Sequence, residues 1–283
     1  MDSPDFAVNN QEQIRVRNLI YDWTGINISD RNKHIIASRL YKRLKHYRVT
    51  SVQEYLNILQ GTEHPEEKQI FINLLTTNET YFFREYIHFE YLGNILKKLK
   101  SLPGTVRFWS AACSTGEEAF SMAMIAAESL GIEGNWEVIA TDINDDVIEK
   151  AHLGIYKMDR LADFPREYLE KYCLKGVRTQ ENRIKIIEPL RAKVRFLKMN
   201  LNEVSPSIGT FHVIFLRNVL IYFDDEKKKH IVDQVSRRLK DKGYLVISLT
   251  ESIRQLNTDL VPVGESYYQK PGPPDTKEPD VFL

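Results

Sequence analysis

The chain has 283 residues, which is long enough for two domains, and its 42% apolar and 28% charged residues predict a soluble globular protein. Its 39 basic and 39 acidic side chains balance, so composition gives no attraction to nucleic acid or membranes. The N-terminus lacks the apolar core of a signal peptide, so export is not predicted. No apolar run approaches the roughly 20 residues of a membrane span. Cys113 and Cys173 belong to no CxxC or Cys/His cluster, which argues against disulfides and a metal site and favours a reducing cytoplasm.

Residues 1–76 are predicted to form a small all-helical domain. Apolar residues recur at helical spacing in four segments, which are 11–24, 31–48, 52–60 and 65–75. Ser29-Asp30 and Ser51 are candidate N-caps, Gly25 and Gly61 are candidate stops, and Pro65 suits a first helical position.

The helix predicted over 31–48 carries positive charge without a single Asp or Glu. On one of its faces four basic side chains follow the i, i+3, i+4, i+7 spacing, namely Arg39, Lys42, Arg43 and His46. Such a face is either a solvated surface or a docking surface for an acidic partner. The single sign of the charge favours docking.

Residues 77–104 are predicted to link this domain to the next. Tyr81, Phe82 and Phe83 are too apolar for one face of a surface helix, so we expect them to wedge the two domains together. Arg84 then either pairs with a structural acid or meets a ligand anion. A helix follows over 87–99, and Pro103-Gly104 ends the connection.

A strand–loop–helix unit predicts a nucleotide site. The strand over 106–112 leads through a loop of small residues, Ser110 to Gly116, into a helix over 117–130. The next strand, over 136–142, ends in Asp142, where nucleotide-binding folds place an acid that binds ribose. Because Gly-x-Gly-x-x-Gly is absent, the pattern leaves two alternatives: a nucleoside without pyrophosphate, such as S-adenosylmethionine, or a core without cofactor.

The remainder of 105–270 completes an α/β sheet around an insertion. After a helix over 145–152, capped by Asn144-Asp145-Asp146, residues 154–193 break the rhythm and predict an inserted β-subdomain. The later elements are strands over 194–201 and 211–220, a helix over 225–239, a turn at 242–243, a strand over 244–249 and a hairpin over 260–269. The proline-rich tail, 271–283, is predicted to be disordered.

Ligands of such sheets bind at the carboxyl ends of the strands, where few polar residues stand here. Glu118 is one of them, although Thr115-x-x-Glu118 also fits a capping box. Asn200 could equally cap a turn. Arg217-Asn218 closes an apolar strand, where a charge needs a partner, and Tyr222 follows.

Four segments, in order, resemble the bacterial chemoreceptor glutamate O-methyltransferases of the CheR type: TTNETYFFRE (76–85), WSAACSTGEE (109–118), ATDI (140–143) and FLRNVLIYF (215–223). The resemblance covers about residues 10 to 270. It implies a helical N-terminal domain and a Rossmann-like methyltransferase domain with a small inserted β-subdomain. It also implies S-adenosylmethionine as methyl donor and S-adenosylhomocysteine as product.

The resemblance carries over site residues as well. Family cofactor contacts fall on Asn78, Thr80, Arg84, Glu118, Asp142, Asn200, Leu201, Arg217 and Asn218. Asp142 would hold the ribose, Asn200 and Leu201 the adenine, and Arg84 and Tyr222 would lie near the methyl group and the glutamate. That acceptor has a pKa of about 4.3 and is ionised at neutral pH, so no general base is needed.

The expected partner is the cytoplasmic helical domain of a chemoreceptor, which would face the basic helix over 31–48. Some family members also bind a receptor C-terminal peptide through a glycine-rich hairpin, but here Arg178 and Asn182 replace glycines. We therefore predict recognition without a tight tether, by a cytoplasmic monomer. The alternatives are a methyltransferase for another protein and a regulatory paralogue that binds without turnover.

Overall fold

The computed structural model describes residues 8–29, 33–161 and 164–273. The proposed cap at Asp30 and most of the proline-rich tail lie outside these ranges. In the part of the chain that is described, the helices are too short or too polar to cross a bilayer.

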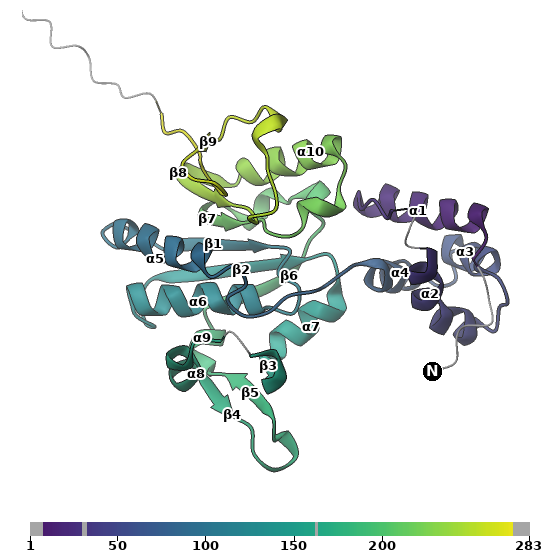
Figure 1. Ribbon diagram of the computed structural model, residues 1–283, viewed down its shortest axis with the longest axis horizontal. Helices are drawn as coiled ribbons and strands as arrows, with labels where there is room; N and C mark the ends of the chain where they lie inside the picture. The colour runs from purple at the N-terminus through teal and green to yellow at the C-terminus, as the bar shows by residue number, and fades with distance from the viewer. Residues whose placement is uncertain (1–7, 30–32, 162–163, 274–283) are drawn as a thin grey trace, which may run out of the picture.

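A four-helix bundle stands at the N-terminal side, beside one edge of the larger body (Figure 1). Its helices are α1 (Asn10–Thr24), α2 (Lys33–Tyr47), α3 (Val52–Gln60) and α4 (Glu67–Leu75). Asn9 and Glu12 form a capping box that starts α1, and Ser51 accepts the Glu54 N–H to start α3. Leu40, Tyr55 and Phe71 are fully buried between the helices. Tertiary packing of these apolar faces stabilises helices that are too short to persist alone.

The larger body is a seven-stranded sheet in the order β6-β2-β1-β7-β8-β10-β9. Its strands are β1 (Val106–Ala111), β2 (Trp136–Asp142), β6 (Val194–Lys198), β7 (Phe211–Phe215), β8 (Leu239–Val246), β9 (Val261–Pro262) and β10 (Tyr267–Gln269). The pairs from β6 to β8 are parallel, and β10 pairs antiparallel with β8 and β9. This arrangement brings the carboxyl ends of β6, β2, β1 and β7 to one edge of the sheet.

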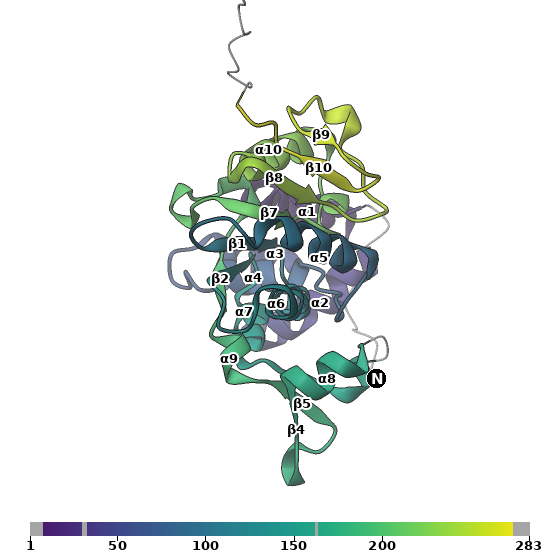
Figure 2. The ribbon, with the colours of Figure 1, turned by 90° about the vertical axis from the view of Figure 1, so that its left-hand side faces the viewer.

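Helices cover both faces of this sheet, and neighbouring residues of one strand point to opposite sides. Phe108 packs with α5 (Ile87–Leu99), α6 (Glu117–Leu130) and α7 (Asp145–Leu153), whereas Trp109 packs with α10 (Asp225–Ser236). Figure 2 shows α5 and α6 in front of the strands. Because both faces are covered, β1, β2 and β7 are buried along nearly their whole length.

The predicted inserted β-subdomain is a separate antiparallel sheet in the order β3-β5-β4. It contains β3 (Ile155–Lys157), α8 (Arg166–Tyr172), β4 (Cys173–Lys175), β5 (Arg183–Ile186) and α9 (Glu188–Arg191). It projects from the main sheet in both views (Figures 1 and 2).

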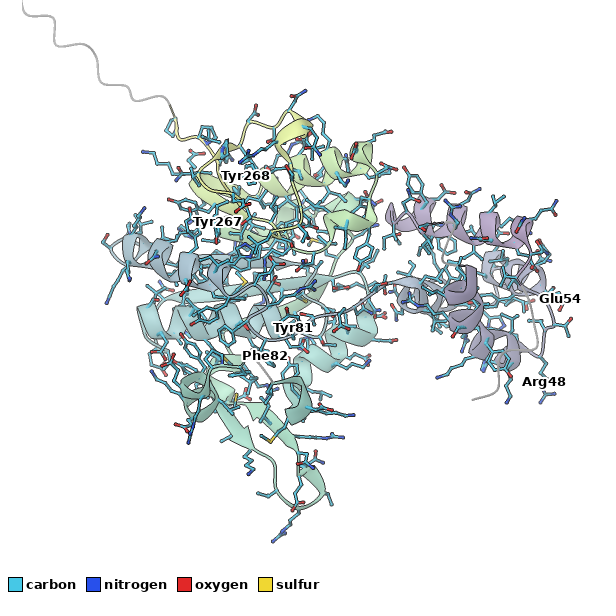
Figure 3. All side chains as sticks on the ribbon, in the orientation of Figure 1. Arg48, Glu54, Tyr81, Phe82, Tyr267 and Tyr268 are labelled. Carbon is cyan, nitrogen blue, oxygen red and sulfur yellow. The ribbon has the colours of Figure 1, made fainter. Side chains whose placement is uncertain are left out.

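The aromatic run after α4 was expected to join the helical bundle to the sheet, and this expectation is wrong. Phe82 contacts Tyr156 and Phe164, with ring centroids 4.8 and 4.7 Å apart, and Phe83 stacks on Tyr168. Phe82 and Phe83 therefore attach the inserted subdomain to the main core, and Figure 3 labels Phe82 where the two meet.

Several predicted boundaries also differ, among them the strand predicted over 194–201, which ends at Lys198. The strand predicted over 211–220 ends at Phe215, and the next residues leave the sheet through Asn218, whose φ is +56°. The predicted turn at Lys242-Gly243 is an irregularity within β8, where the register with β7 shifts. Helix α10 ends at Ser236 rather than 239. In each case the apolar spacing in the sequence continues beyond the residue at which hydrogen bonds of the folded chain turn the backbone.

Candidate active site

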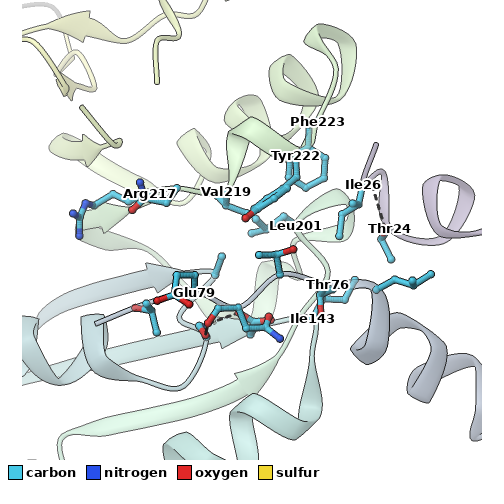
Figure 4. A pocket seen from close by; sticks show the side chains of 18 of the residues that line it. Thr24, Ile26, Thr76, Glu79, Ile143, Leu201, Arg217, Val219, Tyr222 and Phe223 are labelled. Carbon is cyan, nitrogen blue, oxygen red and sulfur yellow. Dashed lines mark hydrogen bonds between the residues drawn. The ribbon is translucent and has the colours of Figure 1, made fainter. Parts of the chain in front are cut away.

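A cavity lies where the carboxyl ends of the parallel strands meet the helical bundle (Figure 4). Its wall includes all ten residues that the sequence proposed for cofactor binding and catalysis: Asn78, Thr80, Arg84, Glu118, Asp142, Asn200, Leu201, Arg217, Asn218 and Tyr222. They come from the ends of β2, β6 and β7, the linker and α6, so only the parallel sheet brings them together.

Asp142 ends β2 and forms part of the cavity wall, although its side chain is only 8% exposed. Its Oδ2 accepts the Ser114 N–H at 2.9 Å, and its Oδ1 accepts the Asn144 N–H at 3.0 Å. Burial raises the pKa of this carboxyl, and the backbone N–H groups oppose that rise. The two bonds fix the carboxylate while leaving acceptor capacity toward the cavity.

The loop of small residues, Ser110 to Gly116, was expected to let a ligand approach the backbone, but Gly116 serves packing. Gly116 has φ +93°, and a Cβ there would lie 2.9 Å from Cβ of Ala151 and 3.1 Å from Phe196. The glycine is required by packing against α7 and β6, because its neighbours in the core leave no room for a side chain. Ala112 and Ser114 of this loop line the cavity instead.

Glu118 pairs with Arg217 in the wall of the cavity. Arg217 Nη1 donates to Glu118 Oε2 at 2.8 Å, and Ser110 Oγ donates to Glu118 Oε1 at 2.7 Å. Burial raises the pKa of Glu118, and the positive charge of Arg217 opposes this. The capping-box interpretation of Glu118 is wrong, since α6 begins after Gly116 without a side-chain cap and Thr115 bonds Glu117 instead.

Arg217 has the partner that its position at a strand end required. The residue is 4% exposed, and besides Glu118 its guanidinium lies 3.3 Å from Glu85 Oε2 and donates to the Arg84 carbonyl. Glu85 in turn accepts bonds from the Ser248 hydroxyl and the Leu249 N–H. Burial alone would raise the pKa of Glu85, but the Ser248 bond and Arg217 outweigh it and hold the pKa at about 2.

Arg84 follows on the rim of the cavity. Its Nη1 donates to the Glu79 carbonyl at 3.1 Å, and its guanidinium lies 5.8 Å from the Tyr81 ring centroid. Among the described residues no carboxylate forms an ion pair with it. Arg84 was expected either to pair with a structural acid or to meet a ligand anion. The first alternative is not observed, so the charge of Arg84 is available to a ligand anion.

The loop from Leu216 to Tyr222 is held by an acid that sequence reasoning missed. Glu251 Oε2 accepts the Asn218 N–H at 3.0 Å and the Ser248 N–H at 3.1 Å, and its Oε1 accepts the Ile221 N–H at 3.3 Å. The Asn218 amide bonds Glu85 and Ser248. The sequence analysis singled out neither Ser248 nor Glu251, because both meet Asn218 across a separation of 30 residues or more.

Asn200 has the capping role that the sequence left open. Its Oδ1 accepts the Asn202 N–H at the start of a short helix, Leu201–Glu203, and its Nδ2 donates to the Trp23 carbonyl at 3.0 Å. Asn78 supplies its carbonyl to the Ser114 hydroxyl at 2.9 Å. Both residues also border the cavity, so capping and ligand contact are compatible.

The four basic residues proposed as one docking face do not share a free surface. Arg43 pairs with the fully buried Glu67, and Arg39 donates to the carbonyls of Leu75 and Thr76 at 2.9 and 3.0 Å. Lys42 and His46 are exposed. Arg39 and Arg43 turn inward because α4 packs against α2 and offers them buried acceptors, which helical spacing alone does not reveal.

The cavity fits a cationic nucleoside better than a dinucleotide. Asp142 and Glu118 are acids in its lining, and the buried Arg217 beside Glu118 is already paired with that carboxylate. Pyrophosphate would lie against acidic groups, whereas a sulfonium would gain from them. Within the described residues no group of three His, Cys, Asp or Glu side chains is placed to hold a metal ion.

Comparison with known proteins agrees with this geometry. The model of the CheR methyltransferase all-alpha domain matches residues 11–76, and that of the CheR methyltransferase SAM-binding domain matches residues 78–268. The chain is 37% identical over 256 residues to a chemotaxis protein methyltransferase of Escherichia coli, covering 90% of this chain and 88% of that protein.

Two further relatives extend the match. Chemotaxis protein methyltransferase 2 of Pseudomonas aeruginosa is 33% identical, with 93% of this chain and 94% of that protein covered. The chemotaxis protein methyltransferase of Borreliella burgdorferi is 34% identical, with 93% and 95% covered. The family models and these relatives span nearly the whole described fold, and the chain therefore belongs to the CheR methyltransferase family.

Proposed function

We propose that this protein transfers a methyl group from S-adenosylmethionine to glutamate side-chain carboxylates of chemoreceptors. The products are glutamate methyl esters and S-adenosylhomocysteine. Its family makes it an S-adenosylmethionine-dependent protein methyltransferase. The observation that carries the finer proposal is the convergence of Asp142, Arg84 and Tyr222 on one cavity beside the helical bundle.

The cofactor residues divide by chemistry. The Asp142 carboxylate, fixed by two backbone N–H groups, suits the ribose hydroxyls. Leu201 and Asn200 would bracket the adenine. Asn78, Thr80 and Asn218 would supply polar contacts along the rest of the cavity. Glu118 and Arg217 would act as a neutral pair at its floor.

The transfer needs positioning more than proton movement. S-Adenosylmethionine, when bound, supplies a methyl group on a cationic sulfur. The receptor carboxylate is ionised at neutral pH, since its reference pKa is about 4.3, so no side chain has to remove a proton. The opposite charges neutralise as the bond forms, and exclusion of water therefore favours the reaction.

Arg84 and Tyr222 are the residues that we assign to the reacting groups. Arg84 has no acidic partner among the described residues, so its charge can orient the incoming carboxylate. Tyr222 ends the short helix Leu220–Tyr222 and would shape the space around the methyl group.

The partner that we propose is the cytoplasmic helical region of a chemoreceptor. The relatives are named as chemotaxis enzymes, and the exposed basic residues of α2, Lys42 and His46, suit an acidic helix. The hairpin with Arg178 and Asn182 supports recognition without a tight peptide tether.

The test is transfer of tritiated methyl from S-adenosylmethionine to membranes that carry chemoreceptors, followed by mild base. We expect base-labile methanol, which identifies carboxyl methyl esters, and a large loss of label with Arg84→Ala. Calorimetric binding of S-adenosylhomocysteine without any transfer of label would contradict the proposal and favour a regulatory protein. Base-stable label would point to a different acceptor group.

A further inference from the structure

Two residues with a left-handed backbone flank Arg84. Phe83 and Glu85 both have φ +56°, a region that residues other than Gly, Asn and Asp seldom occupy. For a bulky residue such as phenylalanine this conformation persists only where the surrounding fold holds it. The fold therefore has to constrain the backbone on both sides of a residue that we assign to the reacting groups.

Helix α6 holds the Phe83 side. The Phe83 N–H donates to the Ser121 hydroxyl at 3.1 Å, and that hydroxyl donates to the Glu117 carbonyl, one turn earlier, at 2.7 Å. Ser121 is fully buried, so water does not compete for the bond. The Phe83 ring also stacks on Tyr168, with ring centroids 5.1 Å apart. A buried hydroxyl and aromatic packing thus fix the residue that precedes Arg84.

The Glu85 carboxylate holds the other side. Polar groups from distant segments surround its two oxygens, among them the Ser248 hydroxyl at 2.7 Å, the Asn218 amide at 3.1 Å, the Leu249 N–H at 3.1 Å and the Arg217 guanidinium at 3.3 Å. These groups belong to the chain just after β7 and just after β8. The carboxylate therefore attaches the backbone next to Arg84 to the ends of two central strands.

Neutralising Arg217 does not by itself account for Glu85. Arg217 already pairs with Glu118 at 2.8 Å, and its distance to Glu85 is longer, 3.3 Å. The shortest contacts of Glu85 are with the neutral Ser248 hydroxyl and with two neutral N–H groups. Several donors on one carboxylate fix its position more tightly than a single ion pair does.

The partners of Glu85 are themselves held in place by another acid. Glu251 accepts the Asn218 N–H at 3.0 Å and the Ser248 N–H at 3.1 Å. The support thus has its own hydrogen bonds, and Glu85 uses it to hold the segment of Arg84.

We propose that Glu85 and Ser121 are positioning residues for methyl transfer, which hold the two left-handed residues on either side of Arg84 and so aim its guanidinium at the incoming carboxylate. The inference rests on the proposed function and on the role of Arg84 in it. Neither Glu85 nor Ser121 belongs to the described cavity wall, whereas Arg84 does, so both act through Arg84.

The aim of Arg84 depends on its neighbours for a geometric reason. If the backbone at Phe83 or Glu85 relaxes out of the left-handed region, the direction of the Arg84 side chain turns with it. In-line transfer requires the carboxylate oxygen, the methyl carbon and the sulfur to be aligned, and a shift of about 1 Å can lower the rate about 100-fold. Binding of the cofactor depends on many other contacts and should change much less.

The first test compares kcat for methyl transfer to chemoreceptor membranes with the dissociation constant of S-adenosylhomocysteine, both for the full-length protein. Glu85→Gln replaces one acceptor oxygen by an amide nitrogen that cannot accept, and kcat should fall about 10-fold while the dissociation constant stays within about 2-fold. Ser121→Ala should give the same split. Glu90→Gln, at an exposed position on α5, is the matched control and should keep both values. Circular dichroism checks each fold, and Ser121→Ala carries the test by itself should Glu85→Gln not fold.

The second test is a double-mutant cycle with Arg84→Ala. Because Glu85 and Ser121 act through Arg84, adding either substitution to Arg84→Ala should lower kcat by less than about 2-fold beyond Arg84→Ala alone. A further loss as large as in the single variants, or native kcat in both single variants, would overturn the positioning role and leave the proposed function intact. Failure of the unaltered protein to transfer methyl groups would overturn both.

Discussion

Arg217 illustrates how one residue links the fold to the site. It follows β7, and its guanidinium lies between the carboxylates of Glu118 and Glu85. The same guanidinium lies over the aromatic rings of Phe89 and Phe215. A charge in this apolar setting is tolerated only because both acids lie beside it. Nη2 of Arg217 also donates to the Arg84 carbonyl, so this hydrogen bond fixes the backbone of a proposed catalytic residue.

Removal of this cation should therefore destabilise the protein strongly. We expect Arg217→Ala to lower the free energy of unfolding by about 3–5 kcal/mol, because Glu118 would remain buried without its partner. Urea denaturation measures the change. The control is Arg166→Ala, which breaks an exposed pair with Glu170 and should cost less than about 1 kcal/mol. A loss of similar size in both variants would show that Arg217 is solvated.

His88 makes stability depend on pH. The ring is fully buried, with Nε2 2.8 Å from the Ser266 hydroxyl, and burial together with Arg217 lowers its pKa to about 4. In the unfolded chain the reference pKa is about 6.5, so on acidification the unfolded state takes up a proton that the native state refuses. The stabilising contribution is complete above pH 6.5 and is lost as the pH falls toward 4.

The variant His88→Asn should remove this dependence. The free energy of unfolding of the unaltered protein minus that of the variant should shrink by roughly 2 kcal/mol between pH 7 and pH 5. Urea titrations at the two pH values give both numbers. The corresponding difference for Ile14→Ala, an exposed position on α1 that carries no titratable group, should stay constant. A His88 difference that is equally constant would contradict a buried neutral ring. His212, whose pKa is also lowered to about 4, would sustain part of the remaining slope.

At the level of elements, the loop from Leu216 to Tyr222 depends on residues far away in the sequence. Glu251 accepts N–H groups from Asn218, Ile221 and Ser248. Burial raises the pKa of this carboxyl, and the N–H bonds oppose the rise. The loop has little regular structure of its own, so its geometry follows from this acid.

Glu251→Gln should separate positioning from binding. One acceptor oxygen becomes a donor facing backbone N–H groups, so the loop shifts, and kcat should fall by about 10- to 100-fold because Tyr222 is misplaced. The dissociation constant of S-adenosylhomocysteine should change much less. Methyl transfer and calorimetry give the two values, with Glu265→Gln as an exposed control. An equal loss of affinity and kcat would place Glu251 in cofactor binding.

At the level of the whole molecule, the helical bundle and the sheet are joined on both sides of the cavity. Asn144 donates to the Asn73 carbonyl and the Thr76 hydroxyl at the α4 end, and Tyr21 donates to Asp224 at the α1 end. Figure 1 shows the bundle standing beside the sheet edge that carries α7. A ligand in between should therefore stabilise both parts together.

S-Adenosylhomocysteine at 100 times its dissociation constant should raise the free energy of unfolding by about 2.7 kcal/mol. Amide hydrogen exchange in helices α1 to α4, which reports on the bundle, and far-ultraviolet circular dichroism in urea, which reports on the whole chain, should give the same increase. Asp142→Ala should abolish it at that concentration. A shift seen only by circular dichroism would mean that the bundle unfolds independently of the cavity.

Local chemistry predicts much of this structure. Helices α3, α5 and α6 and strand β2 have the predicted bounds, because apolar period, caps and glycine stops act over a few residues. The strand ends were also predicted correctly as the place where polar residues gather, since parallel strands direct their carboxyl ends to one edge. The motif resemblance supplied the cofactor and the reaction type, and the family match confirms both.

Contacts between distant segments required the tertiary structure. Arg39 and Arg43 turn inward because α4 provides their acceptors. Glu85, Ser248 and Glu251 hold the loop after β7 only because the fold brings Glu85 and Ser248, about 163 positions apart, into contact. The same holds for residues 24–28, which only the docked bundle places over the cavity. Periodicity and capping record the energetics of neighbours along the chain. The partners of a buried charge are set by packing, which a linear pattern does not contain.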